Sequence, residues 1–150
     1  MGFLDPGKPI VTRLQAVLTA ASLSTVDVLT AVDAGAILDE PLDVPCVYVL
    51  FDGYEPTREL GAGIVQQIEQ TWTALVALRH VSGTSSGDGS PMHLVAAPIL
   101  DAVLSGLCGW RPCAGFDSFQ MAAGGGAVYS SGYGYFSLRF TTRTVIRGTP

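Results

Sequence analysis

The sequence carries little charge. Asp, Glu, Lys and Arg make up 14% of its 150 residues, and lysine occurs once, as Lys8; an ordinary soluble domain has about a quarter. Apolar residues make up 48%, which is enough for a core. A chain of this length is expected to form a single domain, residues 1–150. Because few charges remain to cover its surface, we expect partner molecules to cover part of it.

Long apolar runs and excess basic charge are also lacking. No run approaches the roughly 18 residues that a membrane helix needs, and the net charge of -5 argues against a protein that grips DNA or an anionic membrane. Eight of the thirteen acids lie between Asp27 and Glu59. The last charged residues are all basic: Arg139, Arg143 and Arg147. Two such patches could join one copy of the chain to another, although two ordinary solvated faces would give the same pattern.

Cysteine is scarce and odd in number: Cys46, Cys108 and Cys113. The start, "MGFLDPGKPIV", has no apolar segment of a secretory signal, so we expect reduced thiols in the cytosol. A zinc site needs about four ligands at motif spacing. The three cysteines with His80 and His93 would supply enough ligands, but their spacing matches no zinc motif. We therefore interpret the cysteines as buried structural thiols.

Motifs of catalysis and cofactor binding are absent from the sequence. "GAGIVQQ" and "AGGGAVYSSGYG" are rich in glycine but lack the context of a phosphate-binding loop, and no G-x-S-x-G nucleophile motif occurs. Tyr129, Tyr133 and Tyr135 could stack on bases, but without a basic groove they indicate loop and sheet aromatics. We therefore predict no catalytic residue, metal or cofactor, with a small enzyme or ligand-binding module as the less favoured alternative.

In the first half, apolar spacing predicts a helix over residues 9–21. Residues 25–31 fit either a strand or a second helix running on to Leu38. Residues 45–51 form the plainest strand, and their continuous apolar run predicts burial on both faces. Residues 52–63 read as a turn. Residues 64–81 alternate like a long strand with one buried face, and Gln66–Gln67 would suit a bulge.

In the second half, residues 82–90 form a Ser/Gly loop and residues 90–108 a helix with Pro98 inside it. That helix is apolar on nearly every side, which predicts burial on nearly every side and a second chain as cover. Gly109 is expected to end it in the left-handed conformation, and Trp110 to pack back against its last turn.

The last third is predicted to be β. Residues 116–122 can be a strand, and residues 123–134 a loop or a loose-tipped hairpin. Residues 135–146 alternate so that Arg139 and Arg143 share an outer face. The expected fold class is α+β, with a mainly antiparallel sheet of about four to five strands and two main helices on one face.

The order of these parts resembles the tail-terminator (tail-completion) proteins of long-tailed bacteriophages. An amphipathic helix, "PIVTRLQAVL", precedes the strand "VPCVYVLF", an acidic loop and the long strand "GIVQQIEQTWTALVALRHV". A Ser/Gly loop leads to a helix closing with "LSGLCGWRP", and the aromatic strand "YGYFSLRFTTRTVI" ends the chain. The resemblance spans about residues 9–147.

The resemblance implies a structural virion protein that assembles with itself into a ring, usually a hexamer, at the head-proximal end of the tail tube. Such a ring stops tube polymerisation and contacts the tail tube protein and the head–tail connector, while DNA passes through its lumen unread. Another ring-forming connector or tube protein is the alternative. The charge pattern gives the expected interface: Asp52, Glu55, Glu59, Arg111, Arg139, Arg143 and Arg147.

Overall fold

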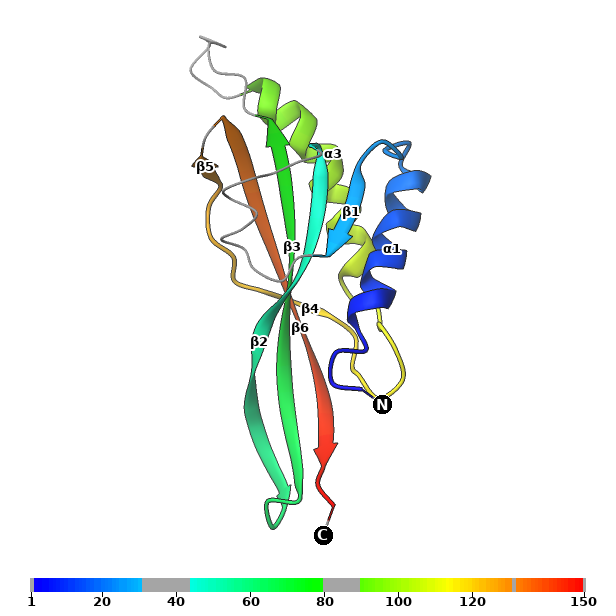
Figure 1. The fold of residues 1–150 in the computed structure, drawn as a ribbon, viewed down its shortest axis with the longest axis vertical. Coiled ribbons are helices and arrows are strands. Elements are labelled where there is room, and N and C mark those ends of the chain that lie inside the picture. The colour runs from blue at the N-terminus through cyan, green and yellow to red at the C-terminus, as the bar shows by residue number, and fades with distance from the viewer. Residues whose placement is uncertain (1, 31–43, 80–89, 131, 150) are drawn as a thin grey trace.

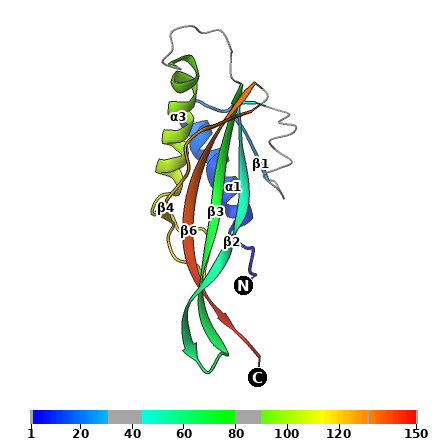
Figure 2. The same cartoon turned by 90° about the vertical axis from the view of Figure 1, so that its left-hand side faces the viewer.

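A computed structural model of the protein describes residues 2–30, 44–79, 90–130 and 132–149. Figure 1 shows its elements in chain order: α1 (Gly7–Ala20), β1 (Asp27–Thr30), β2 (Cys46–Gly61), β3 (Val65–Arg79), α3 (Ser90–Leu107), β4 (Gln120–Ala122), β5 (Val128–Ser130) and β6 (Tyr133–Arg147). Helices α1 and α3 pack together on one face of a long twisted sheet, as the two views agree (Figures 1 and 2). The α+β class and the two helices on one face are confirmed.

The sheet differs from the expected one in two ways. Its strand order is β1-β2-β3-β6-β4, with β5 also paired to β6, which makes six strands in the described residues. Strand β1 runs parallel to β2, whereas every other pair is antiparallel. The prediction of four to five mainly antiparallel strands is therefore only partly right. The sequence could not tell strand from helix at residues 25–31, and β5 lies in a segment read as a loop or loose hairpin.

One half of the molecule, which we call the body, has buried side chains on both faces of the sheet. Val47 and Val49 of β2 face the helices and join a core that includes Leu14 of α1. Cys46, Tyr48, Leu50, Leu75, Ala77 and Tyr135 form a second buried cluster. The two-sided burial predicted for residues 45–51 is confirmed. The one-sided burial predicted for the next strand is wrong in the body, because Leu75 and Ala77 are buried as well.

A buried glutamine marks the end of the body. The Gln70 side chain is fully buried; its Nε2 donates a hydrogen bond to the Phe3 carbonyl (2.6 Å), and its Oε1 accepts one from Trp72 Nε1 (3.1 Å). Both polar groups of the amide are thus paired, which removes most of the penalty for burying them. The amide ties the segment before α1 to the middle of β3.

Beyond Gln70 the sheet continues as a projecting arm, which we define as residues 52–67 and 145–147. It extends below the helices in Figure 1, with the β2–β3 turn at its end. Residues 54–64 are all exposed. The sequence prediction of a turn over residues 52–63 is wrong: β2 runs on to Gly61, and the turn is confined to residues 62–64, with Ala62 and Gly63 at positive φ.

The arm's irregularities lie on β2 and not on β3. The register between β2 and β3 shifts three times, and each shift adds one residue to β2: between Phe51 and Tyr54, between Pro56 and Arg58, and between Glu59 and Gly61. Strand β3 keeps an unbroken register with β6. The bulge predicted at Gln66–Gln67 is therefore wrong. The first shift contains Gly53 at φ 103°, a conformation that glycine adopts without strain.

The end of α3 confirms the prediction for the tryptophan. Gly109 has φ 75°, the Trp110 N–H donates to the Leu107 carbonyl (3.1 Å), and the half-buried indole stacks on Phe119 with a centroid distance of 6.2 Å. As expected from its apolar sequence, α3 is not buried all round within one chain, and the second chain predicted to cover it stays a prediction. Leu94 is 74% exposed and Val95 is 53% exposed, so a broad apolar side of the helix is uncovered.

The last third forms β4, β5 and β6. Only residues 120–122 of the predicted strand 116–122 become β4, while Phe116 makes a single bridge to Thr144. The hairpin alternative for residues 123–134 is confirmed by the pairing of β5 with β6. Of the predicted loop at residues 82–90 only Ser90 is described, and it begins α3. The start of the possible helix up to Leu38 is instead β1, and its remainder, residues 31–38, lies outside the described residues.

Candidate assembly surface

The predicted interface residues fall on two strands that flank β3. Asp52, Glu55 and Glu59 lie on β2, and Arg139, Arg143 and Arg147 lie on β6. The structure thus brings six of the seven together along the arm and its base. Arg111 lies elsewhere, in the turn after α3, where its Nε donates a hydrogen bond to the Phe116 carbonyl (2.9 Å).

Two of the arginines are paired within the chain. Arg139 Nε lies 3.3 Å from Asp52 Oδ2, which also accepts a hydrogen bond from Thr73 Oγ1. Arg143 Nε lies 2.9 Å from Glu69 Oε2. Three of the four side chains are 42–52% exposed and that of Glu69 is 21% exposed, and pairs open to solvent contribute little to stability. The two pairs lie on the face of the sheet away from the helices, whereas Glu59, which is paired with Gln66, lies on the other face.

Other charges on the arm have no such partner. Between described residues, the ion pairs are those of Arg139 and Arg143, which leaves Glu55, Glu59 and Arg147 without an opposite charge in contact. The Glu59 carboxylate accepts a hydrogen bond from the Gly63 N–H (2.6 Å) and so closes the turn. These side chains can form ion pairs with another molecule without breaking one inside the chain.

Sequence reasoning missed Glu69. This residue faces Arg143 directly across the β3–β6 ladder, and its carboxylate forms the shortest ion pair between described residues. The alternation of β3 did place Glu69 on the same side as Thr71 and Thr73. Only the strand register, which the sequence does not give, could have paired it with Arg143.

Two groups of uncovered apolar side chains bear on assembly. On the arm, Leu60 and Ile64 near the turn are each 45% exposed. On the body, Leu94 and Val95 of α3 are more exposed still. Apolar surface of this kind, beside charged residues, is typical of surfaces that bind other proteins.

A groove runs along the outer side of α1, next to the Trp110 turn. It measures about 490 Å³ and is lined by Lys8, Pro9, Thr12, Arg13, Ala16 and Trp110. The Arg13 guanidinium lies 5.7 Å from the centre of the indole ring, and its Nε donates to the Gly106 carbonyl (3.0 Å). The groove therefore has an apolar floor and two cations, and no carboxylate lines it.

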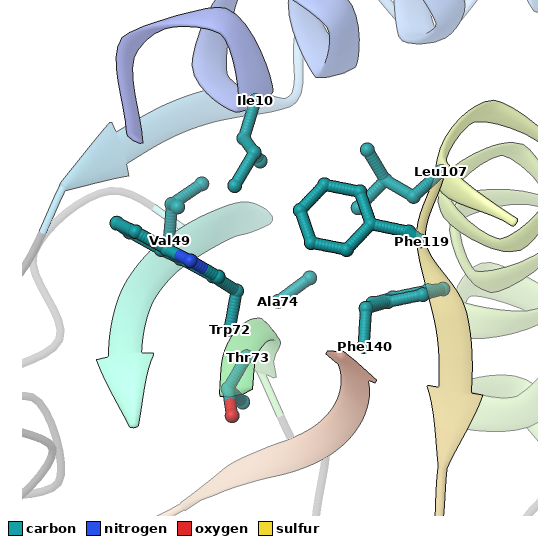
Figure 3. Close-up of a pocket in the computed structure, with 8 residues that line it drawn as sticks. All are labelled: Ile10, Val49, Trp72, Thr73, Ala74, Leu107, Phe119 and Phe140. Carbon is teal, nitrogen blue, oxygen red and sulfur yellow. The ribbon is translucent and has the colours of Figure 1, made fainter. Parts of the chain in front are cut away.

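A second hollow lies inside the core and is closed to ligands. Figure 3 shows Ile10, Leu107, Phe119 and Phe140 pointing toward one another across the space between the helices and the sheet. The space is about 10 Å³, at or below the size of one water molecule. Of its lining residues only Thr73 and Trp72 carry a polar group, and the Trp72 Nε1–H already donates to Gln70 Oε1. This hollow is a packing defect of the core and cannot hold a substrate.

The cysteines do not form one cluster. Cys46 is buried, as predicted, but Cys108 is exposed and Cys113 is half-buried, so the buried-thiol interpretation is wrong for Cys108, which lies just past the end of α3. Burial and the nearby Asp5 carboxylate raise the pKa of the Cys113 thiol, which Arg111 offsets in part. A raised pKa disfavours the reactive thiolate. The side chains of His80 and His93 lie outside the described part of the structure.

The described ranges lack two other features. They contain no group of three or more His, Cys, Asp or Glu side chains able to hold a metal ion. No helix in them is long and apolar enough to cross a membrane.

Comparison with known proteins identifies the family. No curated protein matches the sequence. A family model described as phage tail terminator protein matches residues 1–150, the whole chain. The chain therefore belongs to the phage tail terminator family and has a structural role in the phage tail.

Proposed function

We propose that the protein forms a closed ring, a hexamer by the resemblance, on the head-proximal end of the tail tube. The ring ends polymerisation of the tube and gives the tail a surface that docks on the connector of the head. Family membership supports the tail role. The proposal of a ring is supported mainly by the uncovered apolar surface on a chain with only 14% charged residues.

Two separate binding surfaces on each copy suit a ring. A head-to-tail contact joins different patches of neighbouring copies and closes when the rotation between them divides a full circle. The arm carries one exposed apolar and charged surface at one end of the molecule, and the body carries the groove beside α1 and the bare side of α3. Copies could therefore associate without either surface having to bind itself.

The interface residues predicted from the sequence remain part of the proposal. Glu55, Glu59 and Arg147 lack ion-pair partners in the described chain, and Arg139 and Arg143 stay half exposed while paired. We assign these charged residues of the arm and its base, with Arg111 in the turn after α3, to contacts with neighbouring copies or with the tail tube protein.

The net charge of -5 fits a ring through which DNA passes. Fixed cations around a lumen would grip phosphates and release their counterions, which binds DNA tightly. A net acidic ring leaves the DNA free to slide, and no base-reading group is needed.

The test is assembly on tail tubes. Multi-angle light scattering and native mass spectrometry of the purified protein should give a multiple of the 15.7 kDa chain, alone or after mixing with tubes, and negative-stain images should show density at one tube end. Density along the tube wall or on isolated connectors would favour the alternative, a tube or connector protein. A monomer at high concentration that leaves tubes bare would refute the ring.

The charged face has its own test. Changing both Arg139 and Arg143 to Glu should abolish assembly but leave circular dichroism and the unfolding midpoint nearly unchanged, because the two ion pairs they form are exposed. Arg79→Glu is the matched control, an exposed arginine at the other end of β3. Intact assembly of the double variant would show that this face is not an interface.

A further inference from the structure

The groove beside α1 is complementary to something acidic and apolar. Lys8, the single lysine of the chain, and Arg13 flank its apolar floor. Neither cation forms an ion pair with another described residue. The groove begins at Lys8 in the first turn of α1, where the positive end of the helix dipole favours an incoming carboxylate. Its occupant should therefore present an apolar side chain with a carboxylate close by.

The tip of the arm has this chemistry. Leu60 and Ile64 expose nearly half of their surface. Glu59 is the neighbour of Leu60 on β2, and Glu55 lies four residues before Glu59 on the same strand; neither carboxylate has a cation in contact among the described residues. The arm tip thus has unpaired carboxylates and the groove has unpaired cations, so each could neutralise the other. Both also leave apolar surface exposed to water.

One copy cannot bring its own arm tip to its own groove. The tip lies at the far end of the molecule from the helices, well beyond the lower end of α1 in both views (Figures 1 and 2). The strands that carry the arm run without interruption out of the core of the body, so the arm cannot fold back without breaking the sheet. The occupant must come from another molecule.

We propose that the arm tip of one copy docks in the α1 groove of the next copy, with Leu60 and Ile64 on the floor and Glu55 and Glu59 beside Lys8 and Arg13. This contact rests on the proposed ring and gives it a specific joint. It is heterologous, since it joins two different patches. Its charged part is solvent-accessible, so assembly should weaken as salt rises.

Carbodiimide cross-linking tests the contact directly. This reagent joins a lysine amine to a carboxylate without a spacer, and Lys8 is the only lysine in the sequence. Rings assembled from equal amounts of ¹⁴N- and ¹⁵N-labelled protein should give a cross-linked dimer in which Lys8 of one copy is joined to Glu55 or Glu59 of another. The mixed isotope pattern identifies the link as one between copies.

The outcomes separate this inference from the proposed function. Rings that form but link Lys8 to other carboxylates, or only within one copy, would overturn the joint and leave the ring standing. Protein that assembles neither alone nor on tail tubes would overturn both. Lys8→Arg is the matched control: it keeps the charge, so rings should persist while the Lys8 cross-link disappears.

Charge reversal gives a second, independent readout. Lys8 and Glu55 are exposed and make no hydrogen bond with their side chains to other described residues, so changing them should not unfold the chain. Lys8→Glu and Glu55→Lys should each weaken assembly at least tenfold at low salt, and the double variant should restore most of it. Loss without recovery in the double variant would mean that these two residues do not meet.

Discussion

The body and the arm are built from the same two strands, and they differ in what covers those strands. In the body, "CVYVLF" of β2 is buried on both faces. In the arm, "YEPTREL" of the same strand is exposed along its whole length. The β2–β3 register is regular in the body and shifts three times from Phe51 onward. In the β2–β3 pair, regular pairing thus coincides with packing on both faces and bulges with its absence, whereas the β3–β6 pair stays regular in both regions.

The contrast indicates a division of labour. A register slip in the body would move every buried side chain to the wrong face, so packing holds the register tightly. In the arm no such penalty applies, and irregular pairing is tolerated. The body should therefore supply the stability of the fold, while the arm can vary its surface for binding.

The largest effect should come from a core leucine compared with an arm leucine. Leu14 of α1 is fully buried and Leu60 is 45% exposed. Leu14→Ala should lower the free energy of unfolding by about 2–5 kcal/mol, because it removes buried methyl groups and leaves a cavity. Leu60→Ala should change it by no more than about 0.5 kcal/mol. Urea unfolding followed by circular dichroism measures both.

The Leu14→Ala and Leu60→Ala variants also test whether packing in the arm contributes to the stability of the fold. The measurement is made at concentrations where light scattering shows monomer, so that assembly does not add to stability. If both variants lowered the free energy of unfolding equally, the arm would have to pack against another part of the protein in solution. The body and the arm would then not differ in their contribution to stability.

A smaller effect is expected at the boundary. Gln70→Leu removes the partners of the Phe3 carbonyl and of Trp72 Nε1, both of which the amide now satisfies. An orphaned buried polar group costs about 1–3 kcal/mol, so the free energy of unfolding should fall by about that amount. The same urea experiment detects it.

Gln66→Leu is the matched control for this boundary. Gln66 lies on the same strand and the same side as Gln70 but within the arm, half-buried, and its Nε2 donates only a long bond of 3.3 Å to the Gly63 carbonyl. Its loss should change stability by no more than about 0.5 kcal/mol. If Gln70→Leu were as harmless, the amide would not secure the N-terminal segment to the sheet.

The body was predicted from sequence better than the arm, for the same physical reason. The apolar residues of α1 and β3 recur with each helical turn or strand pleat, so their spacing in the sequence indicates which side is packed. The end of α3 has a local signal of its own, Gly109 followed by Trp110. Residues 52–61 contain Gly, Pro and charges, which read as a turn. They form a strand because β3 pairs with them, and that long-range pairing leaves no periodic mark on a strand exposed on both faces.

The charged surface was predicted in composition but not in arrangement. The acidic β2 and the basic β6 were both recognised, yet the strand order places β3 between them and pairs Arg139 with Asp52 and Arg143 with Glu69. The groove beside α1 was missed. Lys8 and Trp110 are distant in sequence, and only the packing of α1 against α3 and the turn that follows brings them together.

The smallest expected effect concerns the ion pairs at the base of the arm. In a double-mutant cycle with Arg143→Gln and Glu69→Gln, the coupling energy should be about 0.2–1 kcal/mol, because exposed pairs gain little from their attraction. It should vanish in 1 M salt, where screening acts within about 3 Å. The parallel cycle for Arg139 and Asp52 should give a similar value, although Thr73 also holds that carboxylate. A coupling energy of about 2 kcal/mol or more at high salt would mean that these charges are shielded from solvent. A neighbouring molecule that covered the arm during the measurement would shield them in this way. The arm would then be part of an interface even at low protein concentration.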